Sequence, residues 1–513
     1  HPAQVRRRES HHCSNGRKST STTLPRCQTT SRNQMPWHPP LRTSKNFLMK
    51  LIRMITSETN LYSVRQLGVS IGTTHEELEQ FLGILLLMGV VTMPAFSDYW
   101  SEELRYSMIT DTMPLNRFKK LRRPIHFVSE EDASDKYAKI RPMLNRIQKN
   151  CCSIQQEHQQ SIDEMIVPYK GTRAGKLRQY IRNKPHKWGF KLFIRAGVSG
   201  MVHDILPYAG SDTIFATTIT EEEEALELGA KVVIALCKTL EQAEQSVVYF
   251  NNFFCSLELL RYLKQKKGIR ALGTIRPHRL RNCTLKDDKT LKNEGRGSYD
   301  FRSDRDSGIT VVKWLDTKPV HIASTSTAEE PLGNVKRYVK DEKKKMAVPA
   351  PRVILEYNTH MGGVDLADML VELYQTPLKS RRYYLRLFGQ LLYICANNAW
   401  LLSRRDAELH GASQTMPLKD FRAIVAKGLL SANKRKRGRP SSDSQPSKRI
   451  RRPKVPRPEN DFRFDGVGHW QDFAPKGRCR YCPDGQTRII CVKCGVLLCF
   501  VEKRNCFRAF HSK

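Results

Sequence analysis

The segment Ser161-Ile-Asp-Glu-Met-Ile-Val-Pro-Tyr-Lys-Gly171 places a carboxylate inside a short apolar run. Its aliphatic and β-branched residues predict a strand, with Asp163 flanked by Ile162 and Met165. Burying a carboxylate in so apolar a strand is costly unless the group binds a partner. Asp163 is therefore the first candidate site residue of the chain.

The surrounding sequence predicts an α/β fold. Comparable apolar runs predict further strands at Gly189–Ala196, Met201–Tyr208, Ser246–Phe250 and Ala271–Ile275. Helical patterns lie between them at Glu222–Lys238 and Ser256–Lys266. Three strands followed by helix, strand, helix and strand indicate a mixed sheet with helices packed on it.

Helical patterns flank this region on both sides. Apolar residues recur at helical spacing from about 46 onward, over 77–88, 115–125 and 143–156, and later over 363–373, 383–403 and 421–430. Residues 276–351 interrupt the α/β region with charged, glycine-containing sequence. We expect one strand pair there, formed by Ile309–Leu315 and Val320–Ser324.

The charge balance points to a polyanionic partner. The chain has 513 residues with 87 Lys and Arg against 51 Asp and Glu, a net charge of +36. Residues 1–50 carry +9 and residues 431–458 carry +10, and such concentrated cationic stretches favour nucleic acid. For the N-terminal stretch, a solvated disordered tail with only a nuclear-import role is the alternative.

The sequence gives no sign of secretion or of a membrane span. The longest apolar run, 81–91, is far shorter than the roughly 18 residues that a spanning helix needs. No apolar stretch follows the basic residues 6–8, so we expect no secretory signal.

The second basic stretch contains two overlapping signals. Arg-Gly-Arg-Pro resembles an AT-hook core, whose two arginines can lie in a narrow A·T minor groove. Two basic clusters, 434–437 and 448–452, are spaced like a bipartite nuclear-import signal. The two functions are compatible, and we expect a nuclear protein. The candidate DNA-binding residues are Lys434, Arg435, Lys436, Arg437, Gly438, Arg439 and Pro440.

Cysteines are concentrated near the C-terminal end. Of 14 cysteines, six fall between 479 and 506, and two Cys-x-x-Cys pairs eight residues apart indicate tetrahedral zinc sites. Two four-ligand sites need eight ligands, and His469 is our candidate for the eighth. A RING-type module is disfavoured because such modules end in a Cys-x-x-Cys pair, which Cys499 and Cys506 do not form. The expected zinc ligands are His469, Cys479, Cys482, Cys491, Cys494, Cys499, Cys506 and His511.

A second group of acids accompanies Asp163. Asp365 opens a helix directly after two glycines, and Asp368 follows at i+3 on the same face. Carboxylates converging from a strand and a helix are what a two-metal phosphoryl-transfer centre requires. The alternative for Asp365 is a simple helix N-cap.

Several motifs together resemble piggyBac-type transposases. They are the segment at 161–171, Asn183-Lys-Pro-His-Lys-Trp-Gly-Phe-Lys191, Asn251-Asn-Phe-Phe-Cys-Ser256, Gly273-Thr-Ile-Arg276, Val312-Lys-Trp-Leu-Asp-Thr-Lys318 and Gly362-Gly-Val-Asp-Leu-Ala-Asp368. The helical segment from Asn60 to Trp100 is also similar to the N-terminal region of that family. The resemblance runs in order from about residue 50 to 513.

This resemblance implies an RNase H-like catalytic core split by an insertion, a flanking helical dimerisation and DNA-binding domain, and a C-terminal cross-braced Cys-rich module that contacts DNA. Family members cut and paste DNA at TTAA targets with a DDD metal centre. The implied organisation is a disordered basic tail (1–45), helical domain (46–158), core (159–275), insertion (276–351), core (352–374), helical domain (375–430), basic linker (431–460) and zinc module (461–513).

The chain departs from the family at the second acid. Asp163 and Asp365 correspond to the first and third acids, with Asp368 as the accessory acid, but Asn251 occupies the second position. Asp300, Asp304 and Asp306 lie in Arg- and Ser-rich sequence that reads as an exposed loop, so we do not expect them to substitute. One missing charge at an effective dielectric near 20 is worth on the order of a few kcal/mol, or two or more decades of rate.

Three functions remain open. The leading hypothesis is a domesticated, transposase-derived nuclear protein that binds double-stranded DNA, including transposon-end or TTAA sequences, with two structural zinc ions and a weakened magnesium site. Its homodimerisation is left open. The second hypothesis is an active transposase or nuclease that uses Asn251 as a weaker ligand. The third is a zinc-dependent scaffold for chromatin interactions.

Overall fold

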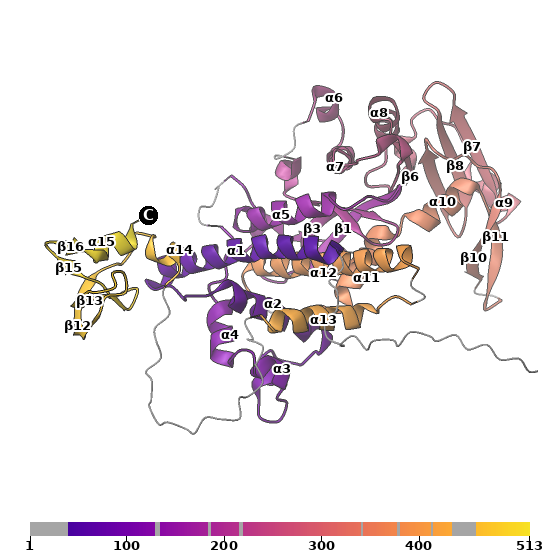
Figure 1. The fold of residues 1–513 in the computed structure, drawn as a ribbon. Coiled ribbons are helices and arrows are strands. Elements are labelled where there is room, and N and C mark those ends of the chain that lie inside the picture. The colour runs from indigo at the N-terminus through magenta and orange to yellow at the C-terminus, as the bar shows by residue number, and fades with distance from the viewer. Residues whose placement is uncertain are drawn as a thin grey trace, which may run out of the picture. The chain divides into compact units, whose positions relative to one another are not determined.

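The computed structural model describes residues 39–128, 134–182, 186–214, 219–339, 342–376, 380–411, 414–432 and 458–512. The basic tail before residue 39 and the linker residues 434–440 therefore lie outside the described residues, as do residues 183–185 of one family motif. Figure 1 shows the chain with its elements labelled. No helix in the described part of the chain combines the length and apolar character that crossing a bilayer requires.

The front of the chain is helical, as the sequence predicted. Its helices are α1 (Pro39–Leu67), α2 (His75–Val90), α3 (Ser107–Thr110), α4 (Leu115–Arg122) and α5 (Arg141–Cys152), with short 3-10 turns η1 (Asp98–Trp100) and η2 (Ala138–Ile140). Helix α1 begins seven residues earlier than expected, because Pro39 and Pro40 fit the first turn of a helix, where no N–H donor is needed. Helix α4 ends sooner than expected, since Pro124 has no backbone N–H with which to continue the helical hydrogen bonds.

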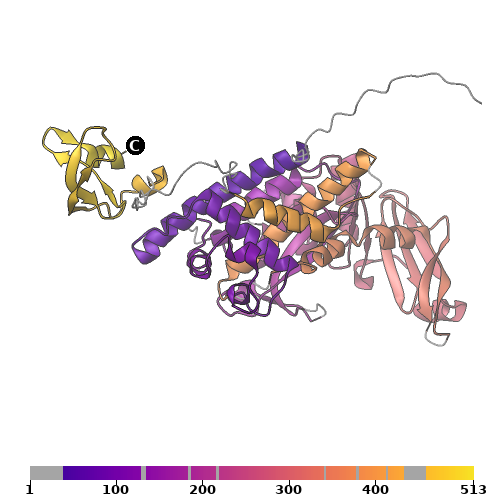
Figure 2. The same cartoon turned by 60° about the horizontal axis from the view of Figure 1, so that its bottom comes forward.

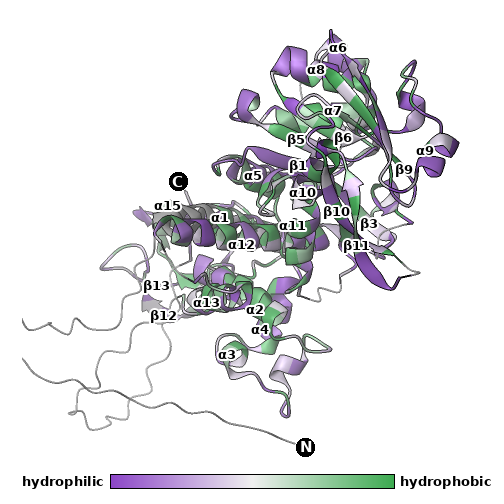
Figure 3. Cartoon of the chain, turned by 90° about the vertical axis from the view of Figure 1, so that its right-hand side faces the viewer, coloured by the Kyte–Doolittle hydropathy of each residue, from purple (hydrophilic) through white to green (hydrophobic). Residues whose placement is uncertain are grey.

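Helix α2 is buried on nearly all sides, which explains its almost continuous apolar sequence. Thr74 caps its N-terminus by accepting a hydrogen bond from the Glu77 backbone N–H at 3.2 Å. Gly83 lies against α13 (Leu418–Leu430), where a Cβ would come within 3.0 Å of the Ala426 carbonyl oxygen. Figure 2 shows helices from both ends of the sequence side by side, and Figure 3 shows the apolar character of α2 in green.

The α/β region is built on a nine-stranded mixed sheet. Its strand order is β2-β3-β1-β5-β6-β9-β8-β7, and β4 pairs with β3. The strands are β1 (Gln159–Pro168), β2 (Gln179–Tyr180), β3 (Trp188–Gly197), β4 (Val202–Pro207), β5 (Val247–Phe250), β6 (Arg270–Thr274), β7 (Tyr299–Asp304), β8 (Ile309–Leu315) and β9 (Pro319–Ser324). Strand β1 is antiparallel to β3 and parallel to β5, which confirms the expected mixed sheet.

Several of the segments that connect consecutive strands of the sheet contain helices. The expected helix over 222–238 is two helices, α6 (Glu221–Glu224) and α7 (Leu228–Cys237), of which α6 starts with a capping box at Thr220. Helix α8 (Leu257–Lys267) ends at Gly268, whose φ of 66° is the left-handed conformation that glycine adopts readily. Short 3-10 turns occupy η3 (Gly175–Leu177), η4 (Gly210–Ile214), η5 (Ala243–Gln245) and η6 (Pro277–Arg279).

The segment 276–351 holds more structure than the single strand pair that we expected. Besides α9 (Asp288–Glu294) it forms five strands, including the hairpin β10 (Gly333–Val339) and β11 (Lys344–Ala350). Strands β9, β8 and β7 continue the central sheet beyond β6. Asp300 and Asp304 therefore lie on an edge strand instead of the expected loop. Strand β7 was missed because its residues are largely exposed and charged, so no apolar alternation marks it.

A buried charged network ties the sheet to its helices. Arg195 of β3 is fully buried and donates to the Leu236 carbonyl at 2.9 Å and to Thr239 Oγ1 at 2.7 Å. Thr239 donates in turn to the buried Asp204 of β4. A buried charge is tolerated only when it is paired and hydrogen-bonded, and each member here has such partners.

The helices after the sheet carry the remaining acids. They are α10 (Arg352–His360), α11 (Gly363–Glu372), α12 (Tyr383–Leu409) and α13. Helix α11 packs directly on the sheet, because the Val364 N–H donates to Ser161 Oγ of β1 at 3.2 Å. A Cβ on Gly363 would meet the Gly197 carbonyl oxygen at 2.3 Å, so the close approach requires glycine there.

The Cys-rich module, considered by itself, is a small set of short strands and helices. These are α14 (Asn460–Arg463), β12 (Gln471–Arg478), β13 (Gln486–Cys491), β14 (Val496–Leu497), β15 (Phe500–Val501), β16 (Arg504–Asn505) and α15 (Cys506–His511). Its buried cluster consists of five cysteines with Val496, Leu498, Phe507 and Phe510. So few apolar side chains make a poor core, which favours additional cross-links. The predicted domain boundaries of the chain as a whole stay predictions.

The packing of α11 on β1 gives a first testable prediction. Gly363→Ala should separate the helix from the strand and cost roughly 1–3 kcal/mol, lowering the melting temperature by several degrees. Gly362→Ala is the matched control, since a Cβ there meets nothing within 4 Å. Equal melting temperatures of the two variants in differential scanning calorimetry would contradict this packing.

Candidate functional site

The sheet register places Asp163 beside Asn251. In the parallel pairing of β1 and β5, Ile162 lies opposite Phe250, so the next residue of each chain segment falls at the same level. Strand β5 ends there, while β1 continues as a partner of β3 alone as far as Pro168. Met165 and Val167, which point to the same side of β1 as Asp163, belong to the core shared with the flanking helices.

Two hydrogen bonds fix the Asn251 side chain. Its Oδ1 accepts from the Phe253 backbone N–H at 2.8 Å, and its Nδ2 donates to Asp163 Oδ1 at 2.9 Å. Because a backbone N–H can only donate, the amide oxygen must face Phe253 and the NH₂ group must face the carboxylate. Asn251 thus offers Asp163 a hydrogen-bond donor at the position where the family resemblance leads us to expect an acid.

Neighbouring carboxyls act on Asp163 as well. Burial, a carboxyl–carboxyl hydrogen bond shared with the Glu164 side chain, and the charges of Glu164 and Asp365 raise the pKa of Asp163 to about 8, against the lowering effect of the Glu164 backbone N–H, which donates to Asp163. A raised pKa means that the charged form is disfavoured by its surroundings.

The two acids of α11 differ in exposure. Asp365 lies in the first turn and is exposed, and its charge reaches Asp163, whereas Asp368 one turn later is partly buried. In the described part of the chain these acids do not join Asp163 in a cluster of ligand atoms close enough to hold one ion. The structure thus brings Asp163 into direct contact with Asn251 and sets Asp365 within electrostatic reach.

Tyr357 of α10 is a further member of this region that the sequence did not suggest. Burial raises its pKa to about 12, and the charges of Asp163 and Asp365 contribute to the shift. Its hydroxyl also interacts with Thr274 at the end of β6. No sequence signal marks Tyr357, because a single tyrosine on an amphipathic helix reads as a core residue.

This donor set does not fit a pair of magnesium ions. Such ions take oxygen ligands, and a two-metal centre needs several carboxylates converging on it. Here the amide NH₂ of Asn251 occupies one oxygen of Asp163, and the amide oxygen is already bonded to Phe253. We therefore derive no catalytic step through magnesium for this arrangement.

The Cys-rich module brings its eight expected ligands together in two groups. One group contains Cys479, Cys482, Cys499 and Cys506, and its four sulfur atoms all lie within 4.8 Å of one another. Cys482 Sγ and Cys499 Sγ are 3.9 Å apart. A tetrahedral ion with metal–sulfur bonds near 2.3 Å separates its sulfur ligands by about 3.8 Å, so this spacing fits.

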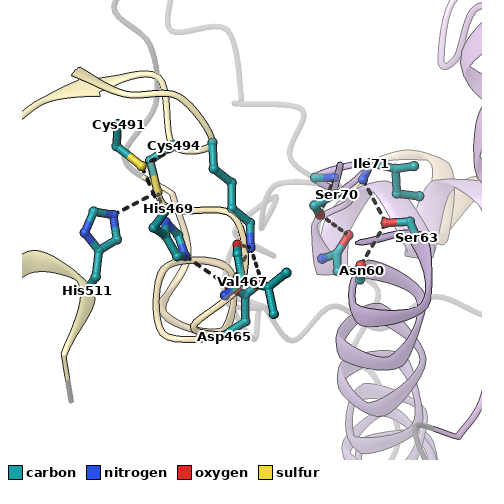
Figure 4. A network of polar contacts seen from close by, with 12 residues as sticks. Asn60, Ser63, Ser70, Ile71, Asp465, Val467, His469, Cys491, Cys494 and His511 are labelled. Carbon is teal, nitrogen blue, oxygen red and sulfur yellow. Dashed lines mark hydrogen bonds and ion pairs between the residues drawn. The ribbon is translucent and has the colours of Figure 1, made fainter. Parts of the chain in front are cut away.

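The second group consists of His469, Cys491, Cys494 and His511, shown in Figure 4. His469 Nδ1 lies 3.4 Å from Cys491 Sγ, and His511 Nε2 lies 3.4 Å from Cys494 Sγ. Both groups are capable of holding a metal ion. Along the chain the two groups alternate: His469 comes before the first Cys-x-x-Cys pair of the other group, Cys491 and Cys494 lie between its two halves, and His511 follows its last cysteine.

Outer partners orient both histidines of the second group. His469 Nε2 lies 3.0 Å from Asp465 Oδ1, and His511 Nδ1 lies 2.7 Å from the Phe507 carbonyl oxygen. A carboxylate or carbonyl on the far ring nitrogen leaves the near nitrogen available as a ligand. Asp465 was missed by the sequence analysis, although an acid four residues before a candidate histidine is a readable signal.

The environment of Cys479 also suits a ligand thiolate. Burial opposes its ionisation, but backbone N–H groups of Cys482, Tyr481 and Cys499 lower its pKa to about 6. The Tyr481 N–H donates to Cys479 Sγ at 3.4 Å, and the Cys494 N–H makes the same contact with Cys491 Sγ. Both Cys-x-x-Cys turns therefore point backbone donors at their first sulfur.

Comparisons with known proteins agree with these observations. A family model described as Transposase IS4 matches residues 46–400. PiggyBac transposable element-derived protein 2 of Homo sapiens is 31% identical over 445 residues, covering 84% of this chain and 70% of that protein. PiggyBac transposable element-derived protein 3 of Homo sapiens is 30% identical over 465 residues, covering 88% and 74%.

The fold is likewise similar to a solved structure. A piggyBac transposase, determined in a synaptic complex with hairpin DNA, matches with a TM-score of 0.63 and 20% sequence identity, over 90% of this chain and 95% of that chain. At that identity the likeness concerns the fold. Together, the family match and the two human relatives establish that this chain belongs to the piggyBac-type transposase family.

Proposed function

We propose that this chain is a transposase-derived, domesticated DNA-binding protein whose metal centre is incomplete, so that it recognises DNA but is impaired in cleavage and strand transfer. The observation that carries the proposal is the hydrogen bond from Asn251 Nδ2 to Asp163 Oδ1. It replaces the cation-mediated contact that two adjacent carboxylates would need. Asp163, Asp365 and Asp368 are what remains of the acidic centre.

The sheet is proposed to be an RNase H-like core. Support comes from its topology: β1, β3 and β4 are antiparallel neighbours, whereas β5 and β6 run parallel to β1 and are connected through α7 and α8. Asp163 on β1 and Asn251 after β5 meet where β5 ends, within electrostatic reach of Asp365 on α11. The carboxyl ends of parallel strands are where α/β proteins place their sites.

DNA is the proposed partner. The net charge of +36 favours a polyanion, and the fold matches that of a transposase whose solved complex contains DNA. Transposon-end or TTAA-containing duplexes are the sequences to test first, with the homodimer as the candidate assembly. The basic stretches 434–437 and 448–452 are proposed to direct the protein to the nucleus.

Two zinc ions are proposed as structural cofactors of the C-terminal module. Zinc suits four-coordinate sites of thiolate and imidazole, whereas magnesium prefers oxygen ligands. One ion would be held by four cysteines and the other by two cysteines and two histidines. Each ion would cross-link strands and loops that the small apolar cluster alone holds weakly.

Two other functions are separated by experiment. The acids Asp163, Asp365 and Asp368 would favour an active transposase if they can bind ions without help from residue 251. A zinc-dependent chromatin scaffold would keep its protein partners after the linker charges are neutralised. Each of these two alternatives predicts a result that differs from the one expected in the experiments below.

Cleavage is the most direct test. We expect Asn251→Asp to cleave transposon-end DNA with Mg²⁺ or Mn²⁺ at least about two decades faster than the unchanged chain, since the missing charge is restored. The double variant Asp163→Ala, Asn251→Asp should be inactive. Equal cleavage by the unchanged chain and by Asn251→Asp would refute the impairment.

Divalent ions should stabilise the Asn251→Asp variant but not the unchanged chain. Asn251→Asp places two carboxylates in contact, so its melting temperature should fall by several degrees and recover in millimolar MgCl₂. The unchanged chain should respond little. Asn252→Asp, which adds the same charge at an exposed neighbour, is the matched control and should show no such recovery.

Native mass spectrometry of the full chain tests the zinc proposal. Two zinc ions are expected per chain, and Cys491→Ser or Cys499→Ser should each remove at least one. Cys283→Ser, a partly buried cysteine outside both groups, should keep both ions. A metal-free chain that melts at an unchanged temperature would contradict a structural role for zinc.

DNA affinity should depend steeply on salt. Neutralising Arg437 and Arg439 to Gln should lower the slope of log K against log salt by about 2, because two phosphate contacts are lost. The control removes two arginines that already pair with acids, Arg281 with Glu258 and Arg302 with Asp300. An unchanged slope in fluorescence anisotropy titrations would show that the linker does not contact DNA.

A further inference from the structure

The connection between β1 and β3 is strongly basic and largely exposed. The described residues 170–182 and 186–188 include six lysines and arginines and no acid. Five of these six side chains, those of Lys170, Arg173, Lys176, Arg182 and Lys187, are exposed. Among the residues that the structure describes, none of the six forms an ion pair, which leaves their charge available to a ligand.

Two large aromatic rings are exposed in the same place. Tyr180 of β2 and Trp188 of β3 lie directly opposite each other, with 52% and 40% of their surfaces exposed. Their ring centroids are 4.9 Å apart. A cross-strand aromatic pair stabilises a hairpin by only about 0.2–1 kcal/mol, and this role alone does not account for the surrounding cations.

Arg178 makes the aromatic pair rigid. Its guanidinium lies 4.2 Å from the Trp188 ring centroid, a cation–π contact. The same group donates to the carbonyl oxygens of Lys170 and Gly171 at 3.1 Å and 3.2 Å. The ring of Trp188 is thus held in place before any ligand arrives, which lowers the entropy lost on binding.

We propose that Tyr180 and Trp188 form a stacking platform for unpaired nucleotides of DNA, with the surrounding lysines and arginines contacting the phosphates. Aromatic faces stack on bases of any sequence, but in a duplex those faces are covered by neighbouring base pairs. An exposed aromatic pair among cations therefore selects single-stranded DNA over duplex. This inference rests on the proposed DNA-binding function and specifies one of its contacts.

The platform lies near the end of β1, the strand that carries Asp163. Five residues of β1 separate Asp163 from Pro168, or about 17 Å of extended chain. This is about five nucleotide steps at the duplex rise of 3.4 Å, and fewer for an extended unpaired strand. A strand reaching the platform would therefore carry its unpaired bases a few nucleotides from the phosphate nearest Asp163.

Binding of the full chain to oligo-dT and to a duplex of equal length tests the platform. Tyr180→Ala should weaken oligo-dT binding roughly 5- to 150-fold, the range seen when a base-stacking aromatic is removed. Duplex affinity should change much less. Tyr338→Ala removes a similarly exposed tyrosine from β10 and should leave both affinities unchanged.

Trp188→Phe provides a second measurement, fluorescence quenching, in a variant that is less disruptive to folding than an alanine substitution. Phenylalanine retains an aromatic face, so oligo-dT affinity should be largely kept. The part of the tryptophan fluorescence that oligo-dT quenches in the unchanged chain should disappear in this variant. Quenching that persists in Trp188→Phe would show that the bases stack elsewhere and would overturn the proposal.

The remaining outcomes separate this inference from the proposed function. If the unchanged chain binds duplex DNA while Tyr180→Ala keeps full affinity for oligo-dT, the platform is refuted and DNA binding stands. If Tyr180→Ala loses duplex and oligo-dT binding equally, stacking on unpaired bases is also refuted. If the unchanged chain binds neither DNA, the proposed function itself fails.

Discussion

The arrangement of the acidic site depends on the double pairing of β1. This strand is hydrogen-bonded to β3 along one edge and to β5 along the other, and apolar side chains from both faces pack into two separate cores. A register slip of one residue would turn every side chain of β1 to the opposite face, so the register is strongly specified. It sets Asp163 beside the end of β5 and under the first turn of α11, where Gly363 allows the helix to touch the strand.

The contact between Asp163 and Asn251 is the basis of the function proposed for this site. Two carboxylates in contact repel each other and require cations between them, whereas an amide satisfies a carboxylate directly. The Phe253 backbone N–H holds the amide oxygen, so the NH₂ group cannot turn away without leaving a donor unpaired. In the proposed function, an amide nitrogen in place of a carboxylate oxygen thus lets this core fold without ions while removing one oxygen ligand.

Much of this organisation could be predicted from the sequence because local pattern and composition carry it. The strands around Asp163, the helices on both sides and all eight ligands of the two Cys/His groups were predicted from spacing alone or from family resemblance. The missed features depend on non-local contacts. Strand β7 is exposed and charged, so it gains its strand conformation from pairing with β8. Tyr357 joins the acidic site only because α10 folds against β1 and β6, and Asp465 acts only through the ring of His469.

The sequence by itself determined which chemical groups this protein has: one amide where the family resemblance implies a carboxylate, a strongly cationic chain, and six clustered cysteines with two histidines. Only the tertiary structure decided how those groups pair. The alternating assignment of residues to two Cys/His groups and the direction of the Asn251 amide follow from segments brought together across tens of residues. The exposed pair of Tyr180 and Trp188 follows from the register of the β2–β3 hairpin. The physical reason is that spacing along a chain limits which side chains can meet, while register and packing select which of them do.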